Sequence, residues 1–151
     1  MTRERLLPDD EQLGAFLGAD LQGPVVMVNL LRYARPADPD DAGSDDDSTS
    51  DTLTEPGVDA YARYGSAFLE LLAEVGGRIV WSGTPVCTLI GDDGVDTWDQ
   101  VVLVEYPSRD AFIAATSSTR YREASTHRTR GLEATVLLVC ETNTPDGSGT
   151  P

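Results

Sequence analysis

The sequence predicts an α+β protein with a ferredoxin-like fold, in which a four-stranded antiparallel sheet carries its helices on one face. Two nearly continuous apolar runs rich in β-branched residues, 25–32 and 98–106, are typical of central strands. Two regions with helical features, 58–75 and 108–130, alternate with the strand-like runs in the order β-α-β-β-α-β. This order predicts the strand order 4-1-3-2, preceded by a short helical extension.

The first half of the chain contains the extension, one strand and one helix. Residues 9–18 are expected to form a short helix, because Leu13, Phe16 and Leu17 recur at helical spacing behind acids in the first turn. The strand at 25–32 follows. The helix at 58–75 ends at Gly76-Gly77, as a left-handed cap would end it. Its apolar stripe consists of Tyr61, Gly65, Phe68, Leu72 and Val75.

The second half repeats the pattern of strands and helices. Residues 78–90 are expected to form a strand that is bent or bulged near 83–85, and 98–106 form the next strand after a turn. Ser108 is a good N-cap for the helix that follows, and a further short helix at 119–130 is closed by Gly131. A last strand covers 133–142.

The negative charge of the chain is concentrated in one segment. The 151 residues include 26 Asp and Glu against 11 Arg and no Lys, which gives a net charge of −15. Eight of these acids lie in residues 36–56 without any basic residue, so we expect a disordered loop inserted there. The expected organisation is a helical extension at 1–24, a ferredoxin-like domain at 25–142 and a disordered tail at 143–151.

The composition also indicates which classes of binding partner are excluded and in which cellular compartment the protein is expected. An acidic chain without a basic stripe repels phosphate groups, which excludes nucleic acid and anionic membrane surfaces as partners. No apolar run has the length of a signal peptide or a membrane span. Cys87 and Cys140 lie in apolar strand-like runs without CxxC or Cys/His spacing, so we expect buried free thiols of a cytoplasmic protein. The predicted topology places them at opposite sheet edges, roughly 14 Å apart, which excludes an intrachain disulfide.

One face of the predicted sheet is left without helices. The runs VVMVNLL and VVLVEY are apolar on both sides, so this face is too apolar for solvent. We therefore expect a homodimer that forms through the sheets.

Several short stretches resemble one known family. They are MVNLLR at 27–32, Tyr61 with Tyr64, Gly76-Gly77, WSG at 81–83, Trp98-Asp99, EYPSRDAF at 105–112, Tyr121, His127-Arg128 and Gly131-Leu132. Residues 25–141 thus resemble the domain of unknown function 1330 family of the dimeric α/β-barrel superfamily, and YPSRDAF is the most specific piece. The resemblance implies a ferredoxin-like protomer whose sheets pair into a barrel-shaped homodimer, and no single activity. Superfamily relatives include cofactor-free oxygenases of aromatic polyketides, lactone isomerases, haem-degrading enzymes and proteins with no assigned reaction.

Two residues are candidates for catalysis. His127, the only histidine, lies four residues after Glu123, whose carboxylate favours the imidazolium. It is a candidate general acid/base or axial haem ligand, and alternatively a surface histidine with one hydrogen bond. Asn29 interrupts an apolar strand, so its amide either stabilises a ligand oxyanion or is tied to backbone or water.

Aromatic residues are the first candidates for ligand binding. Tyr61, Tyr64, Tyr121 and Trp81 are expected to line the space between sheet and helices, unless they are plain core.

Two arginines are further candidates. Arg32 is a ligand anchor or a partner of the acidic loop, although a regular strand places it on the face opposite to Asn29. Arg128 either orients an anionic ligand or caps the helix at 119–130.

The expected function is the binding of a small, partly aromatic or enolisable molecule. If the protein is an enzyme, His127 moves the proton, Asn29 stabilises the oxyanion, and Tyr64 and Tyr121 position the ring, without a cofactor. No nucleotide-binding or hydrolase motif is present, and one histidine with dispersed acids makes no metal cluster. Two alternatives stay open: a non-catalytic ligand-binding protein with His127 facing solvent, and a haem-handling protein.

Overall fold

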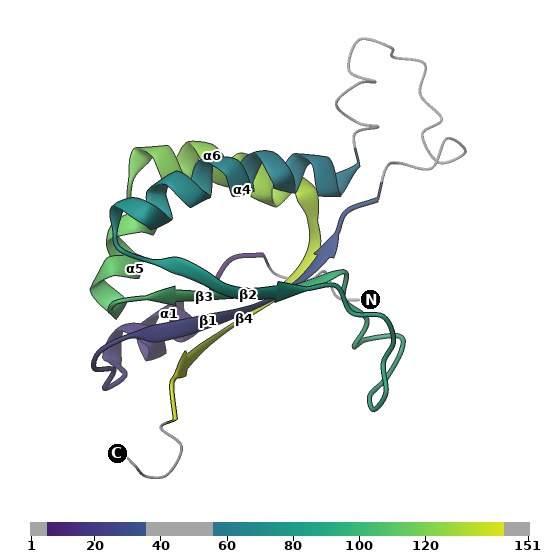
Figure 1. Cartoon of the computed structure of the whole chain (residues 1–151), viewed down its shortest axis with the longest axis horizontal. Helices are drawn as coiled ribbons and strands as arrows, with labels where there is room; N and C mark the ends of the chain where they lie inside the picture. The colour runs from purple at the N-terminus through teal and green to yellow at the C-terminus, as the bar shows by residue number, and fades with distance from the viewer. Residues whose placement is uncertain (1–5, 36–55, 144–151) are drawn as a thin grey trace.

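One antiparallel sheet with the strand order β2-β3-β1-β4 organises the computed structural model, which describes residues 6–35 and 56–143 (Figure 1). Along the chain the elements are α1 (Asp10–Gly18), β1 (Val25–Tyr33), α4 (Gly57–Glu74), β2 (Arg78–Gly83), β3 (Gln100–Tyr106), α5 (Arg109–Thr116), α6 (Thr119–Gly131) and β4 (Leu132–Glu141). The predicted α+β class and strand order are therefore confirmed. The second helical region is divided into α5 and α6, as the two predicted helix starts imply.

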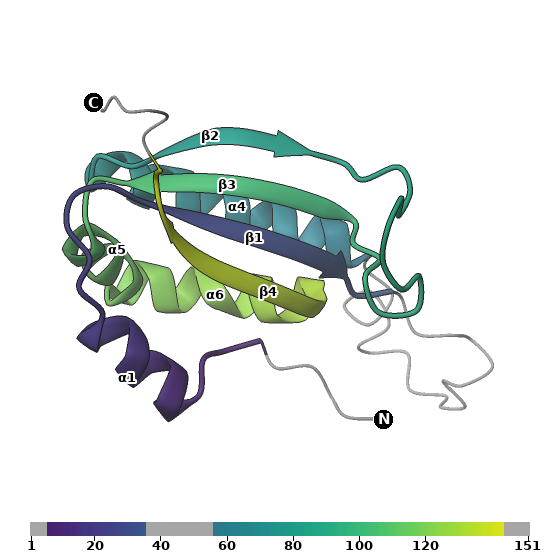
Figure 2. The ribbon, with the colours of Figure 1, turned by 90° about the horizontal axis from the view of Figure 1, so that it is seen from below.

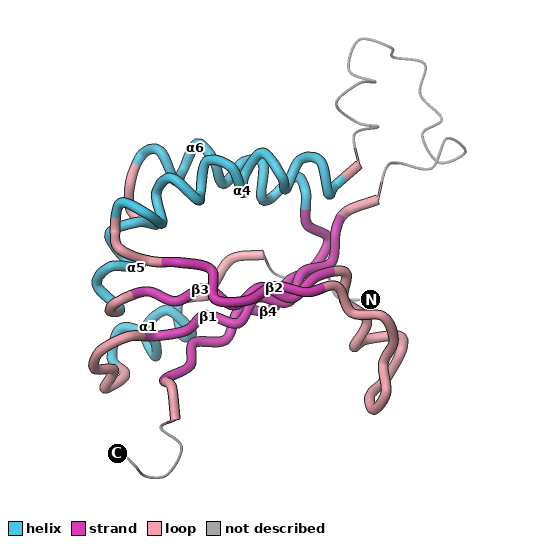
Figure 3. The backbone as a smooth tube through the Cα atoms, in the orientation of Figure 1, coloured by secondary structure: helices cyan, strands magenta, loops and turns pink. Residues whose placement is uncertain are grey.

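The helices and the sheet form separate layers. α4 and α6 lie together over one face of the sheet, and α5 lies at one end of it (Figures 1 and 3). Figure 2, which looks onto the opposite face, shows none of the described helices in front of the strands. The prediction of one helix-covered and one uncovered face is thus confirmed for the described part of the chain.

The core lies between these layers. Its centre consists of Val25, Met27, Leu72, Val104 and Tyr106, each at most 5% exposed. α1 packs at the margin, where the ring of Phe16 meets that of Phe112 edge-on with centroids 5.5 Å apart. Arg109 Nη1 fixes the end of α1 by donating to the carbonyls of Phe16 and Ala19 at 2.9 and 2.6 Å.

Local signals in the sequence set the helix ends. Asp9 caps α1 by accepting from the Gln12 amide at 2.7 Å, and Ser108 and Ser118 cap α5 and α6 in the same way. α4 ends where Gly76 takes the left-handed conformation with φ of 83°. None of the described helices combines the length and the apolar character needed to cross a bilayer.

β2 is shorter than predicted. The strand ends at Gly83 and not at residue 90, because Pro85 lacks the N–H group that a ladder requires. Cys87 therefore lies in the loop 84–99, where it is exposed, while Cys140 on β4 is half-buried and both are free thiols. The expectation of two buried thiols is wrong for Cys87.

The irregularity of β2 also lies earlier than expected. Ile79 pairs with Val104 and Trp81 pairs with Leu103, so Val80 is an extra residue in the strand. The predicted bend near 83–85 is replaced by this bulge.

The remaining expectations concern segments outside the described residues. These are nearly all of the predicted acidic loop at 36–56, residues 144–151 of the predicted tail, and residues 1–5 of the N-terminal extension.

Candidate functional site

A cleft of about 330 Å³ lies between the sheet and the helix layer. Inward-facing residues of the sheet form its floor, and residues of α4 and α6 form its roof. Val58, Leu69 and Ile79 line it while between 43% and 49% exposed, so the cleft opens between α4 and the edge strand β2. A cavity of this size holds a small organic molecule.

All five tyrosines of the chain line this cleft: Tyr33, Tyr61, Tyr64, Tyr106 and Tyr121. The ring centroids of Tyr33 and Tyr61 are 5.7 Å apart, those of Tyr61 and Tyr64 5.1 Å, and those of Tyr64 and Tyr121 6.0 Å. These are the distances of paired aromatic rings. The cleft wall therefore offers ring faces and phenolic hydroxyl groups to a ligand.

The periodicity of two elements brings these rings together. On α4, Tyr61, Tyr64 and Phe68 recur at spacings of three and four residues, so they share the face turned to the sheet. On β1, Asn29 and Tyr33 occupy alternate positions and point to the same side as the core.

Burial keeps the tyrosine hydroxyls protonated. It raises the pKa of Tyr61 to about 12, against the opposing effect of the nearby Arg128 charge. It also raises the pKa of Tyr64 well above the usual range, with Tyr121 and Tyr61 adding to the rise, and it raises the pKa of Tyr106. At neutral pH these phenols therefore donate hydrogen bonds and do not act as bases.

Arg128 is the charged side chain among the described residues that line the cleft. It lies seven residues after Tyr121 on α6, two turns further on, and so shares its face. Its Nη1 donates to the carbonyl of Leu6 at 2.9 Å, and no described carboxylate pairs with it. The predicted candidate thus lies at the cleft as a cation without an acidic partner in the described chain.

Asn29 lies on the cleft floor, but its amide hydrogens are already used. Nδ2 donates to the carbonyls of Met27 and Val102, each at 3.2 Å. The atom left for a ligand is therefore the acceptor Oδ1. An oxyanion needs a donor, so this arrangement does not supply the oxyanion contact expected of Asn29.

His127 lies outside the cleft. It borders an open groove of about 530 Å³ between α4 and α6, lined by residues of these two helices alone. Its Nδ1 is buried there without a hydrogen-bond partner. The helix explains the separation, because a residue adjacent to Arg128 is rotated from it by about 100°. The structure therefore does not bring His127 together with Asn29, Tyr64 and Tyr121.

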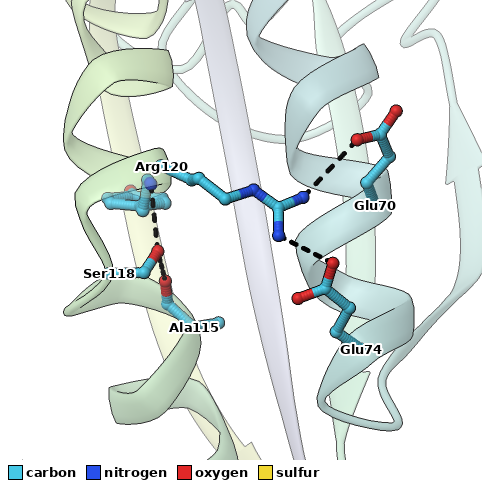
Figure 4. A network of polar contacts seen from close by, with 6 residues as sticks. Glu70, Glu74, Ala115, Ser118 and Arg120 are labelled. Carbon is cyan, nitrogen blue, oxygen red and sulfur yellow. Dashed lines mark hydrogen bonds and ion pairs between the residues drawn. The ribbon is translucent and has the colours of Figure 1, made fainter.

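Charged side chains border the same groove. Figure 4 shows Arg120 reaching from α6 to Glu70 and Glu74 of α4, with nitrogen–oxygen distances of 3.5 and 2.7 Å. Exposed pairs of this kind contribute little to stability. Arg120 and Glu70 thus line the groove that His127 borders, apart from the aromatic cleft.

Arg32 also lies away from the cleft, on the opposite face of the sheet. Its Nε and Nη2 donate to the carbonyls of Thr97 and Val95, both at 3.0 Å, and its guanidinium lies 4.7 Å from the ring centre of Trp98. Glu133 completes the surroundings at 3.9 Å. These contacts hold the returning part of the loop 84–99 and leave Arg32 no access to the cleft.

Trp81 is on the uncovered face because of the bulge at Val80. Without the extra residue it would share the side of Ile79, which lines the cleft. Instead Trp81 is 55% exposed, and Ser82 lines the cleft in its place.

Five polar residues line the cleft without having been predicted from the sequence: Tyr33, Ser82, Gln100, Tyr106 and Thr116. The hydroxyl of Tyr33 donates to Gln100 Oε1 on the neighbouring strand. Alternation along the strands was the available signal, since Gln100 and Tyr106 share the phase of the buried Val104.

The described lining is suited to binding more than to proton transfer. It contains tyrosines, amides, hydroxyls and one arginine, and no histidine, cysteine or carboxylate. General acid/base catalysis needs a group that titrates near the working pH. Within residues 6–35 and 56–143, no three side chains of His, Cys, Asp or Glu are placed to hold a metal ion.

Comparison with known proteins gives consistent results. Residues 53–142 match the family described as Domain of unknown function (DUF1330). Two crystal structures of RPA0582, a protein of unknown function from Rhodopseudomonas palustris, one of them of the methylated protein, are 32% identical to this chain. They superpose with TM-scores of 0.80 and 0.77, covering 97% and 95% of this chain and 100% of theirs. No curated protein matches.

The chain therefore belongs to the DUF1330 family, as the resemblance noted in the sequence implies.

Proposed function

We propose that this DUF1330 member is a homodimeric protein that binds a small, partly aromatic organic molecule in the tyrosine-lined cleft. The observation that supports it best is the gathering of all five tyrosines around one cavity of about 330 Å³. Aromatic walls with a few polar groups are typical of small-molecule sites. The cleft also has an apolar mouth between α4 and β2, through which such a molecule enters.

The sequence leaves open an acid/base enzyme, a non-catalytic binding protein and a haem-handling protein. The residues that line the cleft favour the non-catalytic binding protein. His127 lies in the outer groove, and the described cleft lining holds no other group that accepts a proton near neutral pH. The haem-handling alternative loses its predicted axial ligand for the same reason, since His127 lies outside the cleft.

Self-association is supported by the face of the sheet that the described helices leave uncovered. Val28 pairs with Leu103 on one side and Leu138 on the other, so these three form an apolar row on that face. Leu30, Val101 and Val136 form a second row beside it. A second copy of the same face covers both rows by an isologous contact.

Blocking the cleft tests the binding proposal. Gly65 lines the cleft, and a Cβ atom there meets nothing within 4 Å, so Gly65→Leu fills cavity space without a clash at the backbone. Calorimetric titration with 2-naphthol and 2-naphthoate is expected to show binding to the wild type and at least about tenfold weaker binding to Gly65→Leu. Gly14→Leu is the matched control, because Gly14 on α1 also has open space around it and lies away from the cleft. Equal affinity in the three proteins, or no binding to the wild type, contradicts the proposal.

A further inference from the structure

We propose that the ligand of this cleft is an aromatic carboxylate whose negative group pairs with Arg128. This inference rests on the proposed binding function and specifies its chemistry. It assigns Arg128 as the residue that selects the charge of the ligand.

The first step of the argument is the charge of the cleft. Every described lining residue other than Arg128 is uncharged at neutral pH, and no described carboxylate pairs with the guanidinium. Arg128 is half-buried, and removing part of the hydration of a cation without supplying a counterion is unfavourable. An anionic ligand removes this penalty, while a cationic ligand increases it.

The second step is the position of the guanidinium. Its charge acts on both Tyr61 and Tyr64, where it opposes the rise of each pKa that burial causes. Arg128 also lines the same cleft as these two phenols and lies two turns beyond Tyr121 on one face of α6, so the cation is at the aromatic wall. A carboxylate bound there meets guanidinium N–H donors together with phenolic O–H donors.

The third step is the choice of a carboxylate over other anions. Nη1 is fixed by its bond to the Leu6 carbonyl, which orients the planar group and leaves other N–H donors free. A fixed guanidinium matches the planar, two-oxygen geometry of a carboxylate. The adjoining rings of Tyr61, Tyr64 and Tyr121 then provide faces for an attached aromatic ring.

The test compares two isosteric probes that differ in charge, 2-naphthoate and 2-naphthamide. Titration at pH 7.5 is expected to show the wild type binding the carboxylate at least about tenfold more tightly than the amide. Arg128→Gln is expected to remove this preference, so that the two probes bind within about twofold of each other. Arg128→Lys keeps the charge and is expected to retain part of the preference.

Two neighbouring substitutions are the matched controls. His127→Gln changes the adjacent residue, which faces the outer groove, and Arg130→Gln removes an exposed charge from the same helix. Both are expected to keep the carboxylate preference. Circular dichroism melting shows whether Arg128→Gln folds, and if it does not, the wild-type preference and Arg128→Lys decide the question.

The outcomes separate this inference from the proposed function. If both probes bind equally to the wild type and Gly65→Leu abolishes both, the cleft binds ligands but the charge selection is wrong. If Arg128→Gln folds and retains the preference, the assignment of Arg128 is wrong. If neither probe binds, the proposed function fails and the inference fails with it.

Discussion

The tyrosine hydroxyls of the cleft link the stability of the fold to alkaline pH. The pKa of Tyr61 is raised to about 12 in the folded protein by burial, while an unfolded tyrosine titrates near 10. A raised pKa means that the neutral phenol is favoured in the fold, so its contribution is complete below pH 10 and is lost between about 10 and 12. We expect the free energy of unfolding to fall over this range, by about 1 kcal/mol at pH 11 from Tyr61 alone.

Urea unfolding at pH 8 and pH 11 measures this effect. Tyr61→Phe keeps the ring but removes the titrating hydroxyl, so its loss of stability between the two pH values is expected to be smaller than that of the wild type. A loss of the same size in both proteins would show that Tyr61 does not carry the dependence.

Two neighbouring residues of α6 lie at different sites: Arg128 lines the cleft, and His127 borders the outer groove. The sequence identified both His127 and Arg128 as candidates, together with Tyr121. Helical phase alone places Arg128 on the face of Tyr121 and His127 away from it. This part of the site is predictable from the helix expected at 119–130. The hydrogen bonds that occupy the Asn29 amide were not, because they depend on carbonyl positions across two strands.

At the scale of the elements, the start of α4 and the end of α6 approach closely because Gly57 and Gly131 have no side chains. A Cβ atom on Gly57 would lie 2.3 Å from the Ala34 oxygen and 2.6 Å from the Gly131 oxygen. Ala34 joins both helices, since its N–H donates to Gly131 and its carbonyl accepts from Gly57. We expect Gly57→Ala to destabilise the protein by about 1–3 kcal/mol, because backbone atoms must move apart.

Denaturant unfolding with Gly65→Ala as the control tests this expectation. Gly65 lies inside the same helix with nothing within 4 Å of its Cβ direction, so alanine there is expected to stabilise the protein by about 0.5–1 kcal/mol. Destabilisation of equal size at both positions would indicate a general intolerance of α4 and not a close contact at Gly57.

The bulge and the end of strand β2 were not predictable from the sequence. Its start at Arg78 followed from Gly76-Gly77, but its bulge at Val80 carries no glycine or proline signal. A one-residue insertion turns every later side chain to the other face, which moved Trp81 out of the cleft and Ser82 into it. Residues 84–90 of the loop were predicted as strand because Val86, Leu89 and Ile90 are typical strand residues, although each is at least 90% exposed.

For the molecule as a whole, the topology was predictable because it depends on the order of elements and on the apolar character of two central strands. Strands β1 and β3 are apolar on both faces, and the described helices cover one face. What the uncovered face meets is a property of the assembly, and it gives the last prediction.

Leu138 tests whether the uncovered face forms a dimer. It pairs with Val28 on that face and is 51% exposed, so a glutamate there places a charge in the middle of a proposed apolar contact. We expect the wild type to have a mass in solution of twice 16.2 kDa and Leu138→Glu to be monomeric at micromolar concentration, measured by sedimentation velocity. Leu17→Glu is the control, since Leu17 is 50% exposed on α1, and this variant is expected to remain dimeric. A monomeric wild type, or a Leu138→Glu dimer as stable as that of Leu17→Glu, would mean that the sheet face is not the contact.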